Sequence, residues 1–145
     1  MDKVQTRKLH KEDAPEISRI YAAITRKAVN SDFKRVVEEH ALRDDEACFV
    51  AEHEGKIVGF MISYILTGGF GMTKSAWIAT LGVDPDFMGT GIGAGLAEEI
   101  FKYYKTQGIE NVYTSVRWDS TDLLSFFKTL GFDRSNFINL RKIID

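Results

Sequence analysis

The sequence predicts a single domain of mixed α/β architecture over residues 1–145, and three observations carry this prediction. With 44% hydrophobic and 28% charged residues, the chain has the composition of one soluble globular domain. Strand-like apolar runs alternate along it with amphipathic helical patterns. A strand-like run that stops at Pro85 leads into a glycine-rich turn and then a helix, which is consistent with a mixed α/β fold.

The first elements are a short strand and two helices. Residues 4–9 form the strand candidate, and Asp13-Ala14-Pro15 marks a helix start with an acidic cap and an early proline. Ser31 is expected to cap the second helix. Apolar stripes at helical spacing support both: Ile17, Ile20, Tyr21 and Ile24 in the first, and Phe33, Val36, Val37 with His40 in the second. A lone helical histidine such as His40 is more often a surface or half-packed residue than a base.

A β-hairpin follows, with strands over residues 47–53 and 56–66 joined by the turn Glu54-Gly55. The apolar residues of Ile57–Ile62 do not alternate with polar ones, which predicts strands buried on both faces beneath helices. Cys48 lies in an apolar strand-like run, where a free thiol is usually a small buried hydrophobe and not a nucleophile.

The loop at residues 68–71 leaves two interpretations open. Phe70, together with Tyr64 and Trp77, could form the wall of a binding pocket. These aromatic residues could equally be core residues beside a mobile linker.

The second half of the chain continues the alternation of strands and helices. The expected elements are a strand over 77–83, a helix over 92–107 that stops at Gly108, a strand over 112–117, a helix from Asp119-Ser120 to Leu130, and a strand over 137–144. Gly95 lies in the first turns of the helix over 92–107, where glycine costs about 1 kcal/mol against alanine. We therefore expect backbone or a ligand to approach closely at Gly95.

The glycine-rich turn at residues 88–93 is typical of a binding site for a pyrophosphate group. Glycine lets backbone N–H groups approach an anion, and the helix that follows adds its free N-terminal donors. A Walker-type loop is excluded, because Ala94-Gly95 stands where Lys and Ser or Thr are required. The Rossmann fingerprint fits residues 89–94 literally, but Glu110 begins the next strand where an acidic residue should end it. A coenzyme A site is the third candidate.

The stretch from Val83 to Ala94 resembles the strand, turn and helix of the GNAT superfamily of acyl-CoA-dependent N-acyltransferases. Residues 116–132, which end in Gly131-Phe132, resemble the family's next strand, helix and terminal Gly-Phe. The resemblance implies a central, mostly antiparallel mixed sheet, splayed between the fourth and fifth strands, with helices on both faces. It also implies acetyl transfer from acetyl-CoA to a primary amine of a small molecule or protein. The alternatives are a non-catalytic acyl-CoA-binding regulatory module and a Rossmann-type nucleotide binder.

The resemblance carries over a set of coenzyme-binding residues: Leu81, Gly82, Val83, Met88, Gly89, Thr90, Gly91, Ile92, Gly93, Ala94, Ser120 and Phe127. It implies that a backbone N–H near Leu81 polarises the thioester carbonyl, and that the first two helices border the acceptor amine.

Several positions depart from the family's pattern. Met88 stands where the family usually has Arg or Gln, and Ser120 where it usually has Asn. Phe127 replaces the tyrosine that protonates the leaving sulfur in many members, and a carboxylate that serves some members as base falls near Ala79. Ser120 is the candidate catalytic residue. Asp119, Glu52 and His53 are further polar candidates for a proton relay, although Asp119 and Ser120 also fit simple helix caps.

Charge and cysteine content exclude other classes. The formal net charge of −2 gives no general attraction to nucleic acid or to an anionic membrane. The acidic stretch over residues 38–54 is either a solvated surface or a rim that attracts a cationic amine. A single cysteine permits no internal disulfide and no all-cysteine metal site, so no metal is expected. The N-terminal residues carry no apolar leader, a cytoplasmic location is expected, and a homodimer is compatible with the sequence.

Overall fold

The computed structural model describes residues 3–26, 31–68, 70–71 and 73–145. The chain forms two compact units, one up to Thr114 and one over Ser115–Asp145. The side chain of Ser31 and residue Gly69 lie outside the described residues, so the expected cap and part of the 68–71 loop are not described. None of the described helices combines the length and the apolar character needed to cross a bilayer.

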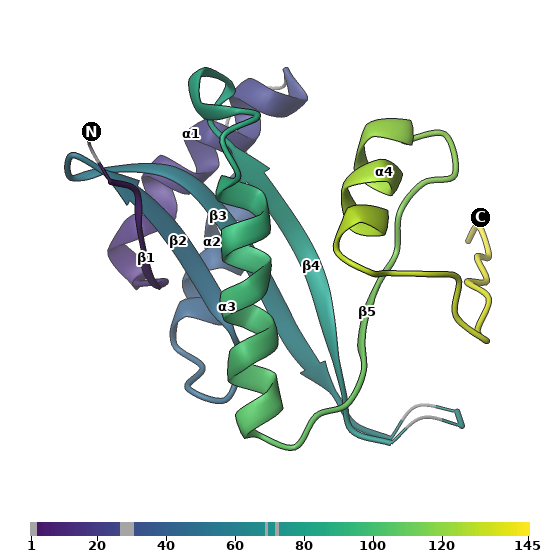
Figure 1. Ribbon diagram of the computed structural model, residues 1–145. Helices are drawn as coiled ribbons and strands as arrows, with labels where there is room; N and C mark the ends of the chain where they lie inside the picture. The colour runs from purple at the N-terminus through teal and green to yellow at the C-terminus, as the bar shows by residue number, and fades with distance from the viewer. Residues whose placement is uncertain (1–2, 27–30, 69, 72) are drawn as a thin grey trace. The chain divides into compact units, whose positions relative to one another are not determined.

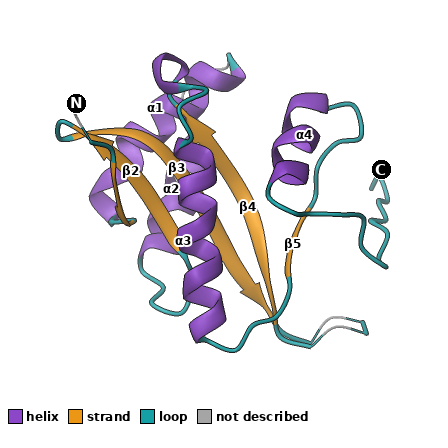
Figure 2. Cartoon of the chain, viewed as in Figure 1, coloured by secondary structure: helices purple, strands orange, loops and turns teal. Residues whose placement is uncertain are grey.

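The first unit contains a five-stranded sheet whose strands follow one another in chain order (Figures 1 and 2). The strands are β1 Gln5–Lys8, β2 Cys48–His53, β3 Lys56–Leu66, β4 Ser75–Val83 and β5 Val112–Thr114. Neighbours pair antiparallel except β4 and β5, which pair parallel. The sheet is therefore mixed and mostly antiparallel, as predicted.

Helices cover both faces of this sheet (Figure 1). On one face, α1 (Ala14–Thr25) and α2 (Ser31–Ala41) form a core with β2 and β3 that includes Phe60 and Ile62. On the other face, α3 (Ile92–Thr106) packs so that Ile92 approaches Gly59 of β3. The middle of β3 is buried from Ile57 to Ser63, which confirms burial on both faces.

The hairpin between β2 and β3 has the predicted two-residue turn. His53 pairs with Lys56, and the two residues between them, Glu54 and Gly55, have φ of 52° and 78°. Both residues are thus left-handed, which is the geometry that matches the twist of the flanking strands.

The second unit contains α4 (Thr121–Thr129), followed by Gly131 at a φ of 93°. The predicted strand over 137–144 is wrong, because these residues have no regular structure. A strand needs a ladder of backbone hydrogen bonds to a partner strand, whereas this segment contacts Ser115 through a side chain, with Asn139 Nδ2 donating to Ser115 Oγ at 3.2 Å. Ile138 and Leu140 are more than 80% exposed.

The fifth strand is shorter than predicted and ends at Thr114. Its pairing with β4 covers only three residue pairs, from Ala76↔Val112 to Ile78↔Thr114. Beyond Ile78 the neighbouring strand changes geometry, because Ala79 is an extra residue in β4 between the pairs Ser63↔Ile78 and Ile62↔Thr80. Such a β-bulge bends its strand and ends regular pairing, which accounts for the short fifth strand.

Candidate functional site

The glycine-rich turn has a well-defined backbone between β4 and α3. A 3₁₀ turn, η2 (Pro85–Phe87), follows Asp84, whose side chain accepts a hydrogen bond from Asp86 N at 2.9 Å. Thr90 Oγ1 donates to Phe87 O at 2.5 Å. Gly89 and Gly91 have φ of 79° and 86°, a left-handed conformation that only glycine adopts without cost. The turn therefore needs glycine at these two positions.

The space around the glycine Cβ positions in and just after this turn is open in the described structure. A Cβ built on Gly89, Gly91 or Gly95 meets no atom within 4 Å outside its own neighbours. We expected either protein backbone or a ligand to approach Gly95 closely. Among the described residues no backbone does so, and this first explanation is wrong. Room for a ligand is the explanation that is left. Gly91 occupies the cap position of α3 and has no side chain that could cap it. The first N–H groups of α3 are consequently available to an anion.

Strand β4 presents a backbone edge that leads toward the turn (Figure 2). Ala76 N donates to Asn111 O at 3.2 Å, and Thr114 Oγ1 donates to Ile78 O at 3.0 Å, so this edge faces β5 at its start. The pairing ends at Ile78, whereas β4 continues to Val83. An unpaired strand edge is a ready template for an extended ligand.

The three predicted residues at the end of β4 face different sides of the sheet. Gly82 pairs with Phe60 on the α1 and α2 face, where a Cβ on Gly82 would lie 2.7 Å from the Phe60 ring and 2.8 Å from Ile24. Glycine is thus required here by packing. Leu81 and Val83 are half-buried on the α3 face, since strand neighbours alternate.

Ser120 and Phe127 belong to the second unit. Ser120 stands at the cap position of α4, where its side chain makes no capping hydrogen bond, and its carbonyl accepts from Leu124 N at 3.0 Å. Phe127 is buried, with its ring 5.3 Å from that of Phe126 and 5.0 Å from that of Phe132. Its role within this unit is packing.

The expected relay candidates already have partners. Asp119 accepts two hydrogen bonds of 3.0 Å from Arg117, which hold the pKa of its carboxyl below the usual range. Glu52 accepts from Arg7 at 3.0 Å. The ring of His53 lies 5.1 Å from that of Phe87, just before the glycine turn.

The structure also contains a buried carboxylate that sequence reasoning missed. Glu46 is only 4% exposed, and its oxygens contact His40 Nδ1 at 2.8 Å and accept from Ile65 N at 3.2 Å. In the sequence, Glu46 is one residue of an acidic stretch, and no local signal separates it from its exposed neighbours. His40 is half-buried, as its pattern predicted.

Cys48 is buried, as predicted, and its thiol donates to Ser63 O at 3.3 Å. Burial raises the pKa of this thiol to about 12, so it is not a nucleophile at neutral pH. Within the described ranges, no three His, Cys, Asp or Glu side chains are grouped as a metal site would need.

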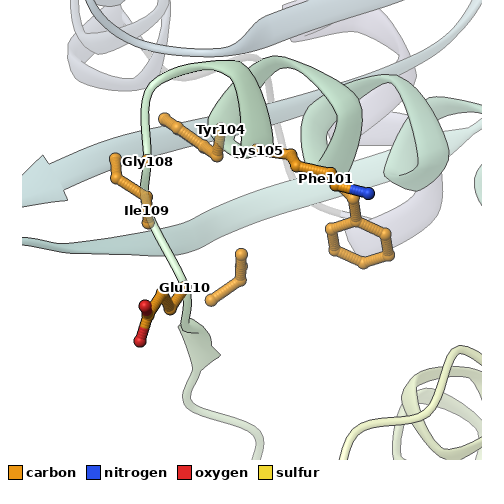
Figure 3. A pocket seen from close by; sticks show the side chains of 7 residues that line it. Phe101, Tyr104, Lys105, Gly108, Ile109 and Glu110 are labelled. Carbon is orange, nitrogen blue, oxygen red and sulfur yellow. The ribbon is translucent and has the colours of Figure 1, made fainter.

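A pocket of about 510 Å³ lies at the other end of α3 from the glycine turn (Figure 3). It is lined by the last turn of α3 and the start of β5: Phe101, Tyr104, Lys105, Gly108, Ile109, Glu110 and Val112. With 15 residues, α3 is about 22 Å long at 1.5 Å per residue, so this pocket is remote from the turn. None of the predicted site residues lines it.

The sheet order and the turn together identify the class of protein. A Rossmann dinucleotide site needs a parallel, doubly wound sheet, whereas four of the five strands here pair antiparallel in sequential order. A mostly antiparallel mixed sheet whose fourth strand leads into a glycine turn and a covering helix is instead what the resemblance to the acyl-CoA-dependent N-acyltransferases implies. The family model described as "Acetyltransferase (GNAT) family" matches residues 14–132, and the chain belongs to this family.

Two curated relatives and one solved structure illustrate the likeness. The mycothiol acetyltransferase of Amycolatopsis mediterranei is 29% identical over 103 residues, which are 69% of this chain and 34% of that protein. An uncharacterized N-acetyltransferase of Methanocaldococcus jannaschii is 33% identical over 99 residues, 66% of this chain and 43% of that protein. The match thus spans less than half the length of each of these relatives.

The aminoglycoside N-acetyltransferase AAC(6')-Iy, solved in complex with CoA, has the same fold. It superposes with a TM-score of 0.83 over 99% of this chain and 96% of that chain, at 16% sequence identity.

Proposed function

We propose that this chain transfers the acetyl group of acetyl-CoA to a primary amine of a small molecule or a protein. The observation that carries the proposal is the continuity of the unpaired β4 edge with the open glycine turn at the start of α3. Family membership and the CoA complex of AAC(6')-Iy support it. Because the family model extends over residues of both units, we propose that they serve one N-acetyltransferase domain.

The residues fit the donor in two places. The backbone of residues 88–94 and the first N–H groups of α3 would hold the pyrophosphate, since the helix terminus favours anions and no side chain fills the space. The edge of β4 at Leu81, Gly82 and Val83 would pair with the amide-containing arm of the coenzyme. Ser120 and Phe127 complete the proposed set by family resemblance alone.

The bound donor would supply a thioester with a good thiol leaving group. In the reaction, the neutral amine forms a new C–N bond, the C–S bond breaks, and the proton lost by the amine is balanced by the proton gained by the thiol. A backbone N–H near Leu81 would stabilise the negative charge that develops on oxygen, and one such donor is worth about 2.7–4 kcal/mol. Positioning of the two reactants can contribute about 7–11 kcal/mol more.

By the family resemblance, Phe127 stands at the position of the usual acid, and the position of the carboxylate that serves some members as base falls near Ala79. A free thiol has a pKa of about 8.5, so a general acid contributes no more than about 10²–10⁴-fold. These substitutions also favour a second candidate function, an acyl-CoA-binding module without turnover. The two are separated by thiol release.

The test combines thermal unfolding with thiol release on the whole chain. Acetyl-CoA should raise the melting temperature, and NAD should not. Addition of primary amines should then release thiol from acetyl-CoA at a rate proportional to protein concentration. A thermal shift without thiol release for any amine would favour the binding module, and the lack of any shift would overturn both candidates.

Variants of the glycine turn locate the donor. Gly91→Val should abolish the shift, but the left-handed φ of Gly91 also strains the free protein. Gly95→Leu avoids this strain because Gly95 lies within α3, with no atom close to its Cβ position. Lys102→Leu is the matched control, since it adds the same side chain to an exposed position of α3 farther from the turn. Only the glycine variants should lose the acetyl-CoA shift.

A further inference from the structure

Three aromatic side chains form a row across β3, β4 and β5. Tyr64 pairs with Trp77, and Trp77 pairs in register with Tyr113. The Trp77 and Tyr113 rings are stacked, with centroids 5.1 Å apart and planes 26° apart. The indole N–H of Trp77 donates to Ser75 Oγ at 3.1 Å, which fixes the ring. We call Tyr64, Trp77 and Tyr113 the aromatic row.

The aromatic row lies on the sheet face that α1 and α2 cover only in part. Tyr64 alternates in phase with Phe60 and Ile62, which belong to the core beneath these helices. The ring of His40, at the end of α2, lies 6.4 Å from that of Tyr64. All three members of the row are half-buried, so a face of the row stays accessible in the described structure.

The row also borders the point where β4 and β5 separate. Trp77 directly precedes Ile78, the last residue of β4 that pairs with β5, and the bulge residue Ala79 follows. On the proposed function, the thioester would bind along the β4 edge just beyond this point. The aromatic row therefore lies on the face of the sheet that carries α1 and α2, the helices that the resemblance places beside the acceptor amine. It also lies next to the proposed binding site of the thioester.

A negative charge lies at one end of the row. Glu46 is buried beside His40 and the backbone of Ile65, and Arg43 Nε is 3.9 Å from it. Burial and, after it, the charge of Glu46 raise the pKa of the Tyr64 hydroxyl, so the field of this carboxylate reaches the row. Electron-rich ring faces add to the attraction for a cation.

We propose that the aromatic row binds the acceptor and selects a primary amine carried on a planar aromatic body. This inference rests on the proposed acetyl transfer and narrows its acceptor. Stacked rings prefer planar partners, and a protonated amine is drawn to the electron-rich faces of aromatic rings. The buried carboxylate at the end of the row, Glu46, is already paired with Arg43 and held by two hydrogen-bonding groups, which favours a monocation over a polycation.

The first experiment compares amines with the unmodified chain. We measure kcat/KM by thiol release for 2-phenylethylamine, the straight-chain n-hexylamine, the polycation spermidine and a short peptide with a free N-terminus. 2-Phenylethylamine should exceed n-hexylamine by about tenfold, the size of one or two aromatic contacts. A preference for spermidine, the peptide or n-hexylamine would overturn the inference while leaving acetyl transfer intact. Failure of every amine would instead contradict the proposed function.

The second experiment asks whether the row itself causes the preference. Tyr64→Leu and Trp77→Leu should each lower the ratio of kcat/KM for 2-phenylethylamine over n-hexylamine by about three- to tenfold. Trp77→Phe should preserve most of the ratio because it keeps an aromatic ring. Tyr103→Leu is the matched control, since Tyr103 lies on α3 and donates to Asp44 O at 2.8 Å, outside the row. An equal loss for both amines in the row variants would show that the row only packs, and would overturn the inference.

Discussion

Gly59 of β3 lies directly against Ile92 in the first turn of α3, where a Cβ on Gly59 would come within 2.8 Å of Ile92 Cγ2. Leu96, one turn later, would be 3.5 Å away. This contact fixes the start of α3 on the sheet, and with it the position of the glycine turn. The contact between Gly59 and Ile92 therefore affects both the stability of the fold and the position of the proposed pyrophosphate site.

Gly59→Ala should lower the free energy of unfolding by about 1–3 kcal/mol, because the added methyl group overpacks the contact with Ile92. Urea unfolding measures this loss. Gly95→Ala is the matched control, because Gly95 lies in α3 close to Ile92 but has open space around its Cβ position. This variant should raise the free energy of unfolding by up to about 1 kcal/mol. A Gly59→Ala protein as stable as the wild type would show that Ile92 moves aside freely.

Acid should weaken the first unit through Asp13. Arg7 donates to both Asp13 carboxylate oxygens at 2.8 Å, and His10 N donates to one of them at 2.8 Å. Burial raises the pKa of Asp13, but the hydrogen bonds from Arg7 and His10 together lower it by more. The pKa of Asp13 in the folded protein therefore lies below its ordinary value. A lowered pKa in the folded state contributes stability that is present above the unfolded pKa of about 3.9 and is lost as pH falls through the folded pKa.

Asp13→Asn should therefore cost about 1.5–3 kcal/mol at pH 7 and flatten the decline of stability below about pH 4. Unfolding by urea at several pH values measures both effects. Glu99→Gln, which affects an exposed pair with Lys102 at 3.6 Å, should change stability by less than about 1 kcal/mol. Equal pH profiles for Asp13→Asn and the wild type would contradict the role of Asp13.

The thiol of Cys48 should be unreactive in the folded protein. Its pKa of about 12 leaves almost no thiolate at pH 8, and the side chain is buried. Reaction with an aromatic disulfide reagent at pH 8 should be at least about 100-fold slower in the folded protein than in urea. Equal rates would show that this strand opens readily.

The same thiol should weaken the fold in alkali. A raised pKa in the folded state means that stability is complete below the unfolded pKa of about 8.5 and falls as pH rises toward 12. Burial also raises the pKa of Tyr104 to about 12, so Tyr104 contributes over the upper part of this range. Cys48→Ala should therefore remove only part of the alkaline loss, and thermal unfolding from pH 8 to 11 measures the difference.

Phe127→Tyr should leave the acetyl-CoA shift unchanged and should not lower turnover, because it adds the hydroxyl that the family's usual tyrosine supplies. Phe126→Tyr, the adjacent half-buried residue, is the control for an added hydroxyl in α4. A collapse of turnover in Phe127→Tyr alone, measured by thiol release, would show that the packing of Phe127 against Phe132 is required for catalysis.

Local chemistry made part of the fold predictable. Gly55, Gly89 and Gly91 adopt the left-handed φ values that their neighbours in the sequence require, so the hairpin turn and the glycine turn before α3 could be placed from the sequence. The continuous apolar run of β3 likewise predicted burial under helices on both faces, because burial on two faces removes the polar half of the strand pattern.

Features that arise from pairing between distant segments were not predictable. Ala79 is a bulge only because of its register with Ile62 and Ser63, and its sequence neighbours give no sign of it. Glu46 differs from other acidic residues only after β2, β3 and α2 have come together around it. The expected strand over 137–144 had a suitable apolar pattern, but a pattern supplies no partner strand.

The bulge at Ala79 leaves one position of β4 able to accept other side chains. Its neighbours Ile78 and Thr80 are committed to β3 partners, whereas Ala79 has none and its side chain is exposed. A new side chain at this position would displace no packed neighbour, yet it would stand beside the proposed reaction site. A carboxylate introduced at Ala79 would thus add a basic group beside that site while the pairing of β3 and β4 stays the same.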